Sequence, residues 1–366
     1  MAPYAQLLSK DKHLALLFRG AIATQAEFIT KAPYCNAFQP PLDSLIPGVP
    51  DHSHDKVHPI YDPSDVFECK YELDSLASFL KLSWLYYDKL ELLNFITPTW
   101  LKAVTLVLKV IEEQSEPTFD PVTNQAKYPH YLFQRNTNIG SETLSLGMSL
   151  GNTCLTLGGA GNPVNANTSL VRSAFRPSDD ATILQFLVPS NAFMSVELGH
   201  LSTILREIIK RHTSLSRDTI SFLAEQAHGL SKSIANGIKD HAIFSHPLFD
   251  RVYAYEVDGY GGRLFMDDAN LPSLLSLPLL GFVDKTDPVY QATRRMVLSR
   301  FGNPYFLEGG QFKGIGGPHI GVKHAWPMSL LVQIMTSDDD EEIMELLDLL
   351  KTSTGGLGLM HESGTL

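Results

Sequence analysis

Two adjacent aspartates, Asp179 and Asp180, follow a Pro-Ser dipeptide in the stretch VRSAFRPSDDATILQFLVPSN. Arg172 and Arg176 precede them, and an apolar run, residues 183–188, follows. Carboxylates rarely border a segment destined for burial unless they are paired or take part in a reaction. Pro-Ser-Asp also suits a helix start, so one aspartate could cap a helix, which leaves the second unexplained. The pair is therefore a candidate for acid or base chemistry.

Further carboxylates lie in segments rich in aromatic residues and glycine. In KYELDSLASFL, Lys70 and Asp74 stand one helical turn apart, which on a surface would give an ion pair, and Glu72 shares that turn. In YEVDGYGGRLFMDDANLP, acids alternate with rings as in a sugar-binding wall, where hydroxyls need charged acceptors and ring faces serve as platforms. The acids of that segment are Glu256, Asp258, Asp267 and Asp268, and two later glycine-rich segments add His319, His361 and Glu362. This combination favours hydrolysis of glycosidic bonds by two carboxylates.

Several other classes of function find no support in the sequence. It contains no G-x-S-x-G, no G-x-x-x-x-G-K-[ST] and no H-E-x-x-H motif, and its histidines do not cluster at metal-ligand spacing. We therefore expect neither a metal nor a cofactor. The net charge of −11 disfavours a nucleic acid or an anionic membrane as partner, and no apolar run is long enough to span a bilayer. Three widely spaced cysteines (Cys35, Cys69 and Cys154) are expected to be core thiols.

The elements that must position these side chains are mainly helices. Apolar residues recur at helical spacing over 11–31, 70–88, 99–114, 192–212, 217–240, 286–300, 325–336 and 338–353. Ser337 is the expected N-cap of the last of these, ahead of an acidic first turn. Residues 253–262 predict one short β-hairpin, and 143–170 resemble a long loop. No composition shift divides the chain, so we predict one all-α domain, 1–366, with function carried on the loops.

A dozen ordered motifs resemble glycoside hydrolase family 125, in wording closest to its fungal branch. The motifs are KYELDSL, LFQRNTN, GNPVN, RSAFRPSDDA, LVPSNAF, YEVDGYG, MDDANLPSLLSLPLLG, NPYFLEG, GGPH, WPMS, TSDDDEE and LMHES. Together with KAPYCNAFQPP, which carries the fungal wording, the matches run from about Tyr34 to Ser363 in the family's order. The resemblance implies an (α/α)6 barrel and a metal-independent exo-α-1,6-mannosidase that acts with inversion on terminal mannose of an oligosaccharide or an N- or O-glycan.

The resemblance also implies roles for individual residues. The general acid would be Asp180 or Asp179, with Asp180 favoured because Asp179 could be used as a cap, and the general base would be Glu362. An inverting pair stands about 6.5–9.5 Å apart, and we expect the apolar run 183–188 to raise the pKa of the acid above its usual ~4. The implied sugar-binding residues are Glu72, Asp74, Arg172, Arg176, Asp258, Asp267, Asp268, His319 and His361.

Three departures from the family pattern leave alternatives open. The chain lacks the Trp-Leu-Arg-Asp-Ser segment that precedes this region in family members, stops soon after His-Glu-Ser, and carries extra residues between Leu146 and Gly159. We expect a barrel incomplete at both ends. One alternative is a non-catalytic remnant that binds mannosides, and another is a metal-dependent enzyme of a related toroid with Asp267 and Asp268 as ligands. A secretory location is a guess from the resemblance, and the oligomeric state is not predicted.

Overall fold

Helices dominate this computed structural model, which describes residues 1–366 except 50–54, 136–154, 212–215, 311, 355 and 366. The helices are η1 (Ala2–Leu7), α1 (Lys12–Lys31), α2 (Leu73–Leu90), α3 (Pro98–Ser115), α5 (Thr156–Gly159), α6 (Val188–Arg211), α7 (Arg217–His241), α8 (Leu277–Leu280), α9 (Pro288–Val297), η3 (Pro318–Ile320), α10 (Pro327–Met335) and α11 (Asp340–Thr352). The strands are β1 (Ala37–Phe38), β2 (Lys56–His58), β3 (Val66–Glu68), β4 (Leu132–Gln134), β5 (Phe186–Leu187), β6 (Ile243–His246), β7 (Asp250–Tyr253), β8 (Glu256–Val257), β9 (Arg263–Leu264), β10 (Phe306–Glu308), β11 (Lys313–Ile315), β12 (His324–Ala325) and β13 (Gly364–Thr365).

The long helices lie where apolar periodicity predicts them, and local caps fix their starts. The Asp11 carboxylate accepts hydrogen bonds from the backbone N–H groups of His13 (2.8 Å) and Leu14 (3.1 Å), which begins α1. Thr97 caps α3 in the same way, with Pro98 in the first helical position. The buried residues of α1 and α3 recur mostly every three or four positions, so each of these two helices presents one apolar face to its neighbours.

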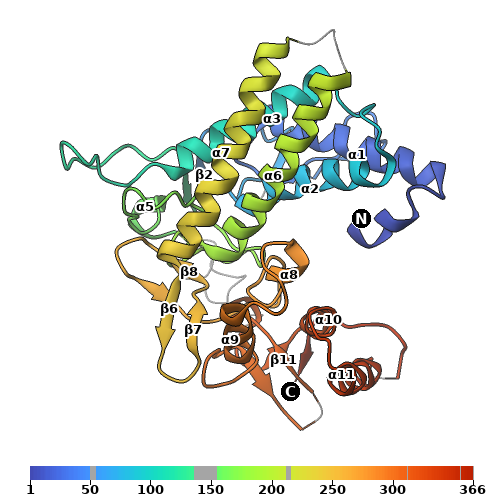
Figure 1. The fold of residues 1–366 in the computed structure, drawn as a ribbon, viewed down its shortest axis with the longest axis vertical. Helices are drawn as coiled ribbons and strands as arrows, with labels where there is room; N and C mark the ends of the chain where they lie inside the picture. The colour runs from blue at the N-terminus through green and yellow to red at the C-terminus, as the bar shows by residue number, and fades with distance from the viewer. Residues whose placement is uncertain (50–54, 136–154, 212–215, 311, 355, 366) are drawn as a thin grey trace.

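These helices pack in pairs around the main core. α6 packs along α7 and against α2, and α1 packs against α3 (Figure 1). The predicted seam of α7, from Ile220 to Ile238, is buried as expected. Trp100 of α3 is fully buried and donates its indole N–H to the Ser83 hydroxyl of α2 at 3.0 Å, so the largest core side chain leaves no unpaired donor. No helix among the described residues is both long and apolar enough to cross a bilayer.

The strands are short and form small antiparallel pairs in the connections between helices. β8 and β9 make the hairpin predicted around the glycine turn, and β5 adds to it as β5–β8–β9. Further pairs, such as β6–β7 and β10–β11, were not predicted. With two to four residues each, such strands carry too little alternation to be recognised in a sequence.

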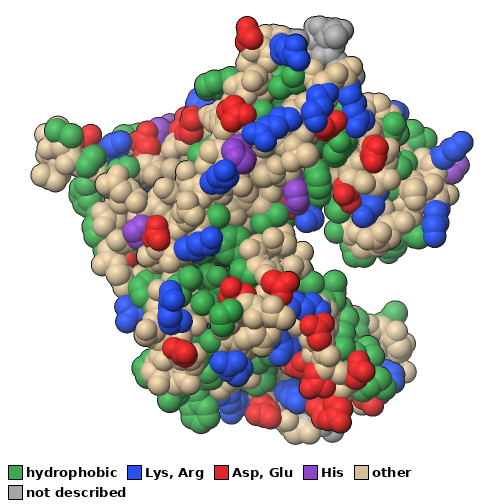
Figure 2. All heavy atoms as spheres, viewed as in Figure 1, with side chains coloured by type: hydrophobic (Ala, Val, Ile, Leu, Met, Phe, Trp, Pro, Cys, Tyr) green, Lys and Arg blue, Asp and Glu red, His purple; other side chains and the backbone are tan. Residues whose placement is uncertain are grey.

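The molecule is open on one side. Figure 1 places η1 and α1 on one side of this opening and α10 and α11 on the other. In the space-filling view, Figure 2 shows a deep hollow at the same edge. Helices on both sides expose large apolar side chains, among them Leu16 and Leu17 of α1, Met335 of α10 and Met344 of α11.

One expectation about the cysteines is wrong. Cys35 and Cys69 form a disulfide between the end of α1 and the start of α2. The strand pair β1–β3, in which Ala37 lies opposite Glu68, brings the two cysteines together, and a spacing of 34 residues gives no hint of this pairing. Cys154 and residues 143–154 of the loop predicted over 143–170 lie outside the described residues.

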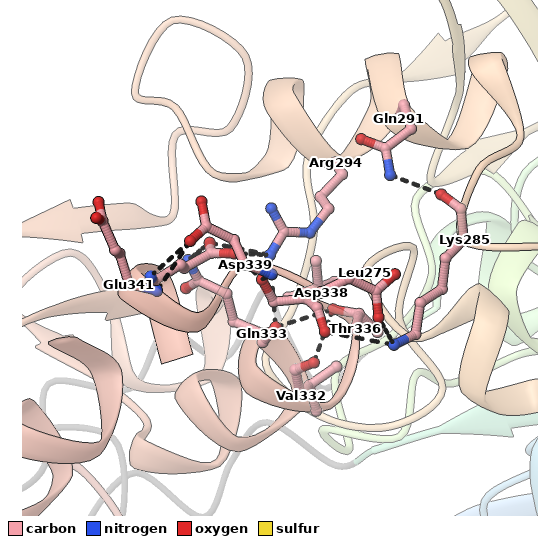
Figure 3. A network of polar contacts seen from close by, with 12 residues as sticks. Leu275, Lys285, Gln291, Arg294, Val332, Gln333, Thr336, Asp338, Asp339 and Glu341 are labelled. Carbon is pink, nitrogen blue, oxygen red and sulfur yellow. Dashed lines mark hydrogen bonds and ion pairs between the residues drawn. The ribbon is translucent and has the colours of Figure 1, made fainter. Parts of the chain in front are cut away.

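A polar network joins α9 to the start of α11 (Figure 3). Arg294 of α9 donates to both carboxylate oxygens of Glu342, at 2.9 and 2.8 Å. Asp339, rather than the expected Ser337, is the N-cap of α11, because its carboxylate accepts from the N–H groups of Glu341 and Glu342. The Ser337 hydroxyl donates to Glu342 instead. The acidic first turn therefore serves helix capping and this interhelix pair.

Candidate active site

The two adjacent aspartates lie on a tight turn and do not start a helix. The Asp179 N–H donates to the Arg176 carbonyl (2.9 Å), the Arg176 N–H donates to the Asp180 carbonyl (2.8 Å), and Phe175 pairs with Ala181 across the turn. Asp179 has a φ of 67°, in the left-handed region that few residues other than glycine adopt. The capping role expected for Asp179 is therefore wrong, because the next helix begins only at Val188.

The turn gives its two carboxyl groups different surroundings. Asp180 is 1% exposed; its Oδ1 lies 3.3 Å from His319 Nδ1, and its Oδ2 has no hydrogen-bond partner among the described residues. The Asp179 side chain is 52% exposed and lies 3.1 Å from the ammonium of Lys70. Lys70 is itself nearly buried and also contacts Glu68, at 3.2 Å. It thus meets Asp179 rather than Asp74, because α2 starts at Leu73 and leaves Lys70 in the preceding loop.

His319 joins the turn to the later part of the chain. Its hydrogen bond with Asp180 raises the pKa of the imidazole, although partial burial acts in the opposite direction. The ring lies over Trp326, with centroids 6.5 Å apart and planes within 27°. His319 belongs to η3, and Trp326 immediately precedes α10. The GGPH and WPMS motifs are therefore brought beside the RPSDD motif.

The arginines before the turn do not contact the two aspartates through their guanidinium groups. Arg176 donates from Nε to Glu256 Oε1 at 2.6 Å, and both residues are buried. Arg172 donates to the Gln114 carbonyl and to the Thr118 hydroxyl, and burial lowers its pKa to about 10. The arginines therefore serve other acceptors than the candidate acid.

The apolar run after the turn leads into a strand and a helix. Phe186 and Leu187 are fully buried, but they form β5 and continue away from the turn into α6. Ile183 is 54% exposed, and its N–H donates to Glu256. The described contact on the Asp180 carboxyl group comes from His319, an imidazole that no local pattern around the turn could have indicated.

Glu72 and Asp74 form a second acidic group at the start of α2. Glu72 Oε2 accepts from the Ser75 hydroxyl at 2.9 Å, and Asp74 Oδ1 accepts from the Ser190 hydroxyl of α6 at 3.0 Å. Burial raises the pKa of Asp74 to about 6. Burial first, and then the charges of Asp74 and Asp179, raises the pKa of Glu72 well above its usual value. Buried acids of this kind are typical of functional sites.

Three aspartates that were predicted to bind sugar accept hydrogen bonds from other groups of the protein. Asp258 accepts from the N–H groups that close the glycine turn between β8 and β9. Asp267 accepts from two backbone N–H groups, and burial raises its pKa to about 7. Asp268 differs, because its Oδ2 accepts from the Ser178 hydroxyl at 2.9 Å and so borders the aspartate turn. A sugar-binding role for all three remains a prediction.

The expected base lies on the C-terminal segment. Glu362 and His361 are both exposed. Two residues later, Gly364 pairs with Ala325 in β12–β13, which places this segment beside the strand that leads to Trp326. Within the described part of the chain, no group of three or more His, Cys, Asp or Glu side chains is arranged to hold a metal ion.

Comparison with known proteins identifies the family of this chain. The profile of the family described as "Metal-independent alpha-mannosidase (GH125)" matches residues 1–366. The chain belongs to glycoside hydrolase family 125. It is 54% identical over 363 residues to the "Meiotically up-regulated gene 157 protein" of Schizosaccharomyces pombe, a match that covers 99% of this chain and 67% of that protein.

A solved member of the family confirms the fold. The structure of a metal-independent α-mannosidase from Streptococcus pneumoniae, in a non-productive complex with α-1,6-mannobiose, superposes with a TM-score of 0.83 at 32% identity. The match covers 99% of this chain and 77% of that one. The family 125 chain therefore has the expected six-hairpin helical fold, and the expectations of a hydrolase and of the α-mannosidase class are confirmed at the level of the family.

Two contributors to the site were not among its predicted residues. Glu256 is bonded to both flanks of the aspartate turn, and Lys70 contacts Asp179. Glu256 appeared as one acid of a presumed sugar-binding wall and Lys70 as the partner of Asp74. Glu256 stands between Tyr255 and Val257, two apolar residues that are fully buried, and an acid in such a position could have suggested an internal partner.

Proposed function

We propose that this family 125 protein is an inverting exo-α-1,6-mannosidase that removes terminal mannose from an oligosaccharide or from an N- or O-glycan. The observation that carries the proposal is the similarity, over 99% of the chain, to a solved mannosidase complexed with α-1,6-mannobiose. The buried and semi-buried acids around the aspartate turn supply the groups that such a reaction needs.

In the proposed reaction, one carboxylic acid acts as the general acid and one carboxylate as the general base. Asp180 gives its proton to the glycosidic oxygen as the bond from that oxygen to C1 of the terminal mannose breaks. Glu362 takes a proton from a water molecule whose oxygen bonds to C1 from the opposite face. The products are β-mannose and the shortened glycan; Asp180 then regains a proton from solvent and Glu362 releases the one it took. For this geometry the two carboxyl groups must stand about 6.5–9.5 Å apart when the sugar is bound.

Asp180 is the better candidate for the acid on the grounds of its contacts. Its Oδ2 has no partner among the described residues, so this oxygen can carry a proton toward a ligand, and its Oδ1 is held by His319. Asp179 faces Lys70 and Glu72, where a carboxylate can accept sugar hydroxyls as part of an acidic patch. We assign sugar binding to Glu72, Asp74, Asp268 and His319, and to His361 beside the proposed base.

Hydrolysis of α-1,6-mannobiose, followed by proton NMR, tests the proposal directly. We expect mannose to appear first as the β-anomer, at a rate unchanged by EDTA, with α-1,2- and α-1,3-mannobiose cleaved far more slowly. First appearance of α-mannose would overturn the inverting mechanism. Binding of the disaccharide without turnover would favour the alternative of a non-catalytic mannoside-binding protein.

A further inference from the structure

The Glu256 carboxylate joins both ends of the turn that carries the two aspartates. Its Oε1 accepts from Arg176 Nε at 2.6 Å, before the turn. Its Oε2 accepts from the N–H groups of Ile183 (3.0 Å) and Leu184 (2.9 Å), after the turn. One side chain therefore holds the two flanks of residues 177–182 at a fixed separation.

The pair formed by Arg176 and Glu256 is buried against a short β-sheet. Glu256 is in β8, the middle strand of β5–β8–β9, and lies opposite Leu187 of β5. Glu256 is 0% and Arg176 2% exposed. Burial alone would lower the pKa of Arg176, but the charge and hydrogen bond of Glu256 raise it, so the guanidinium keeps its charge. An ionised pair away from water has few alternative partners, which favours a single geometry.

A second bond holds the middle of the turn. The Ser178 hydroxyl donates to Asp268 Oδ2 at 2.9 Å, and Asp268 is fully buried and held in turn by Asn270. The turn is thus held at three places: before it at Arg176, within it at Ser178, and after it at Ile183 and Leu184. The left-handed backbone of Asp179 is the kind of conformation that persists when its surroundings over-determine it.

We propose that Glu256 is a positioning residue for the general acid of this enzyme, acting through the turn rather than by touching the substrate. The inference rests on the function proposed above, but it holds whichever of Asp179 and Asp180 is the acid, because one turn carries both. A general acid works within hydrogen-bond reach of the departing oxygen. A displacement of about 1 Å can reduce the rate of such a step on the order of 100-fold.

Leaving-group chemistry separates this role from a general contribution to folding. The alcohol released from α-1,6-mannobiose needs a proton, whereas 2,4-dinitrophenolate departs without one. Misplacing the acid therefore slows hydrolysis of the disaccharide and spares 2,4-dinitrophenyl α-mannoside. A loss of folded enzyme, in contrast, lowers both rates by the same factor.

The test is Glu256→Gln, which keeps the shape but replaces one acceptor oxygen with a donor. We expect kcat for α-1,6-mannobiose to fall about 100-fold or more, with KM little changed, while kcat for the dinitrophenyl mannoside falls less than about fivefold. Glu256→Asp keeps the charge but shortens the side chain, so it should show the same substrate bias to a smaller extent. Ser178→Ala, a milder change that leaves the pair intact, should show the bias at about threefold to tenfold.

Glu197→Gln is the matched control. Glu197 is also fully buried and paired, with Lys81 of α2 at 3.0 Å and His200 of its own helix α6 at 2.8 Å, so these contacts do not involve the turn. We expect it to change both substrates equally. Equal losses on both substrates in the soluble Glu256 variants and in Ser178→Ala would overturn the positioning role and leave the proposed function standing. If the unmodified protein cleaves neither substrate, the proposed function fails and this inference fails with it.

Discussion

Two arginine–carboxylate pairs join distant segments of this molecule, and they differ mainly in burial. Arg176 and Glu256, under the aspartate turn, have side chains 2% and 0% exposed. Arg294 and Glu342, between α9 and α11, are 16% and 24% exposed. In the second pair one guanidinium nitrogen donates to both carboxylate oxygens and Gln333 adds a further bond, yet the pair borders water, whereas the first is enclosed by β5, β8 and the turn. The comparison suggests that a buried pair fixes a catalytic geometry and that a semi-exposed pair joins helices.

The largest expected difference between the two regions is in activity. Asp180→Asn should reduce hydrolysis of α-1,6-mannobiose about 10³-fold, because the amide has no proton to give to the leaving oxygen. Glu342→Gln, in the other region, should leave the rate within about twofold, since a charge pair at the edge of the helices contributes little to the site. Initial rates of mannose release measure both. A greater loss in Asp179→Asn than in Asp180→Asn would transfer the role of acid to Asp179.

The next largest expected difference between the two pairs is in their contribution to the free energy of unfolding. Removal of one partner from the buried pair, in Glu256→Ala, leaves the Arg176 charge unpaired away from water and should cost about 3–5 kcal/mol. Glu342→Ala leaves Arg294 free to find water and should cost about 1 kcal/mol. Urea denaturation followed by circular dichroism gives both free energies of unfolding. Equal costs would mean that burial is not what distinguishes the pairs.

The sequence predicts the helical framework well and the contacts of the site less well. Helices such as α1 and α7 follow from apolar periodicity and from caps such as Asp11, which are local signals. The motif RPSDD identifies the turn, but the partners of its acids come from far along the chain: Lys70 precedes it by 109 residues and His319 follows it by 139. Such pairings depend on tertiary packing, so local patterns assigned Lys70 to Asp74 and gave no sign that His319 contacts Asp180.

The disulfide gives the turn region a further support that α9–α11 lacks among the described residues. Cys69 is adjacent to Lys70, which contacts Asp179, so the Cys35–Cys69 bond fixes the loop behind the site. Closing a loop of 34 residues should stabilise the protein by about 3–4 kcal/mol through the entropy of the unfolded chain. Cys35→Ser/Cys69→Ser should lose about that free energy in urea denaturation, and dithiothreitol should destabilise the unmodified protein without affecting the variant. Thiol titration of the denatured protein that finds all three cysteines free would contradict the disulfide.

The smallest expected difference is in the dependence of stability on pH, where the two regions should have opposite signs. Burial raises the pKa of Asp74 to about 6, so its native state binds the proton more tightly and its contribution to stability is lost as pH rises from about 4 to 6. For Glu342, burial acts to raise the pKa, but hydrogen bonds from Ser337, Gln333 and Arg294 lower it overall, so its contribution to stability is lost as the pH falls below the usual pKa of a glutamate.

Asp74→Asn should therefore flatten the fall in stability toward pH 6 by on the order of 1 kcal/mol. Glu342→Gln should flatten the rise in stability above pH 4 by less, because solvent screens a partly exposed charge. Urea midpoints measured between pH 3.5 and 7 distinguish the two. The same sign for both variants would show that the acids near the turn are not held in their neutral form by burial, and the contrast between the regions would then rest on geometry alone.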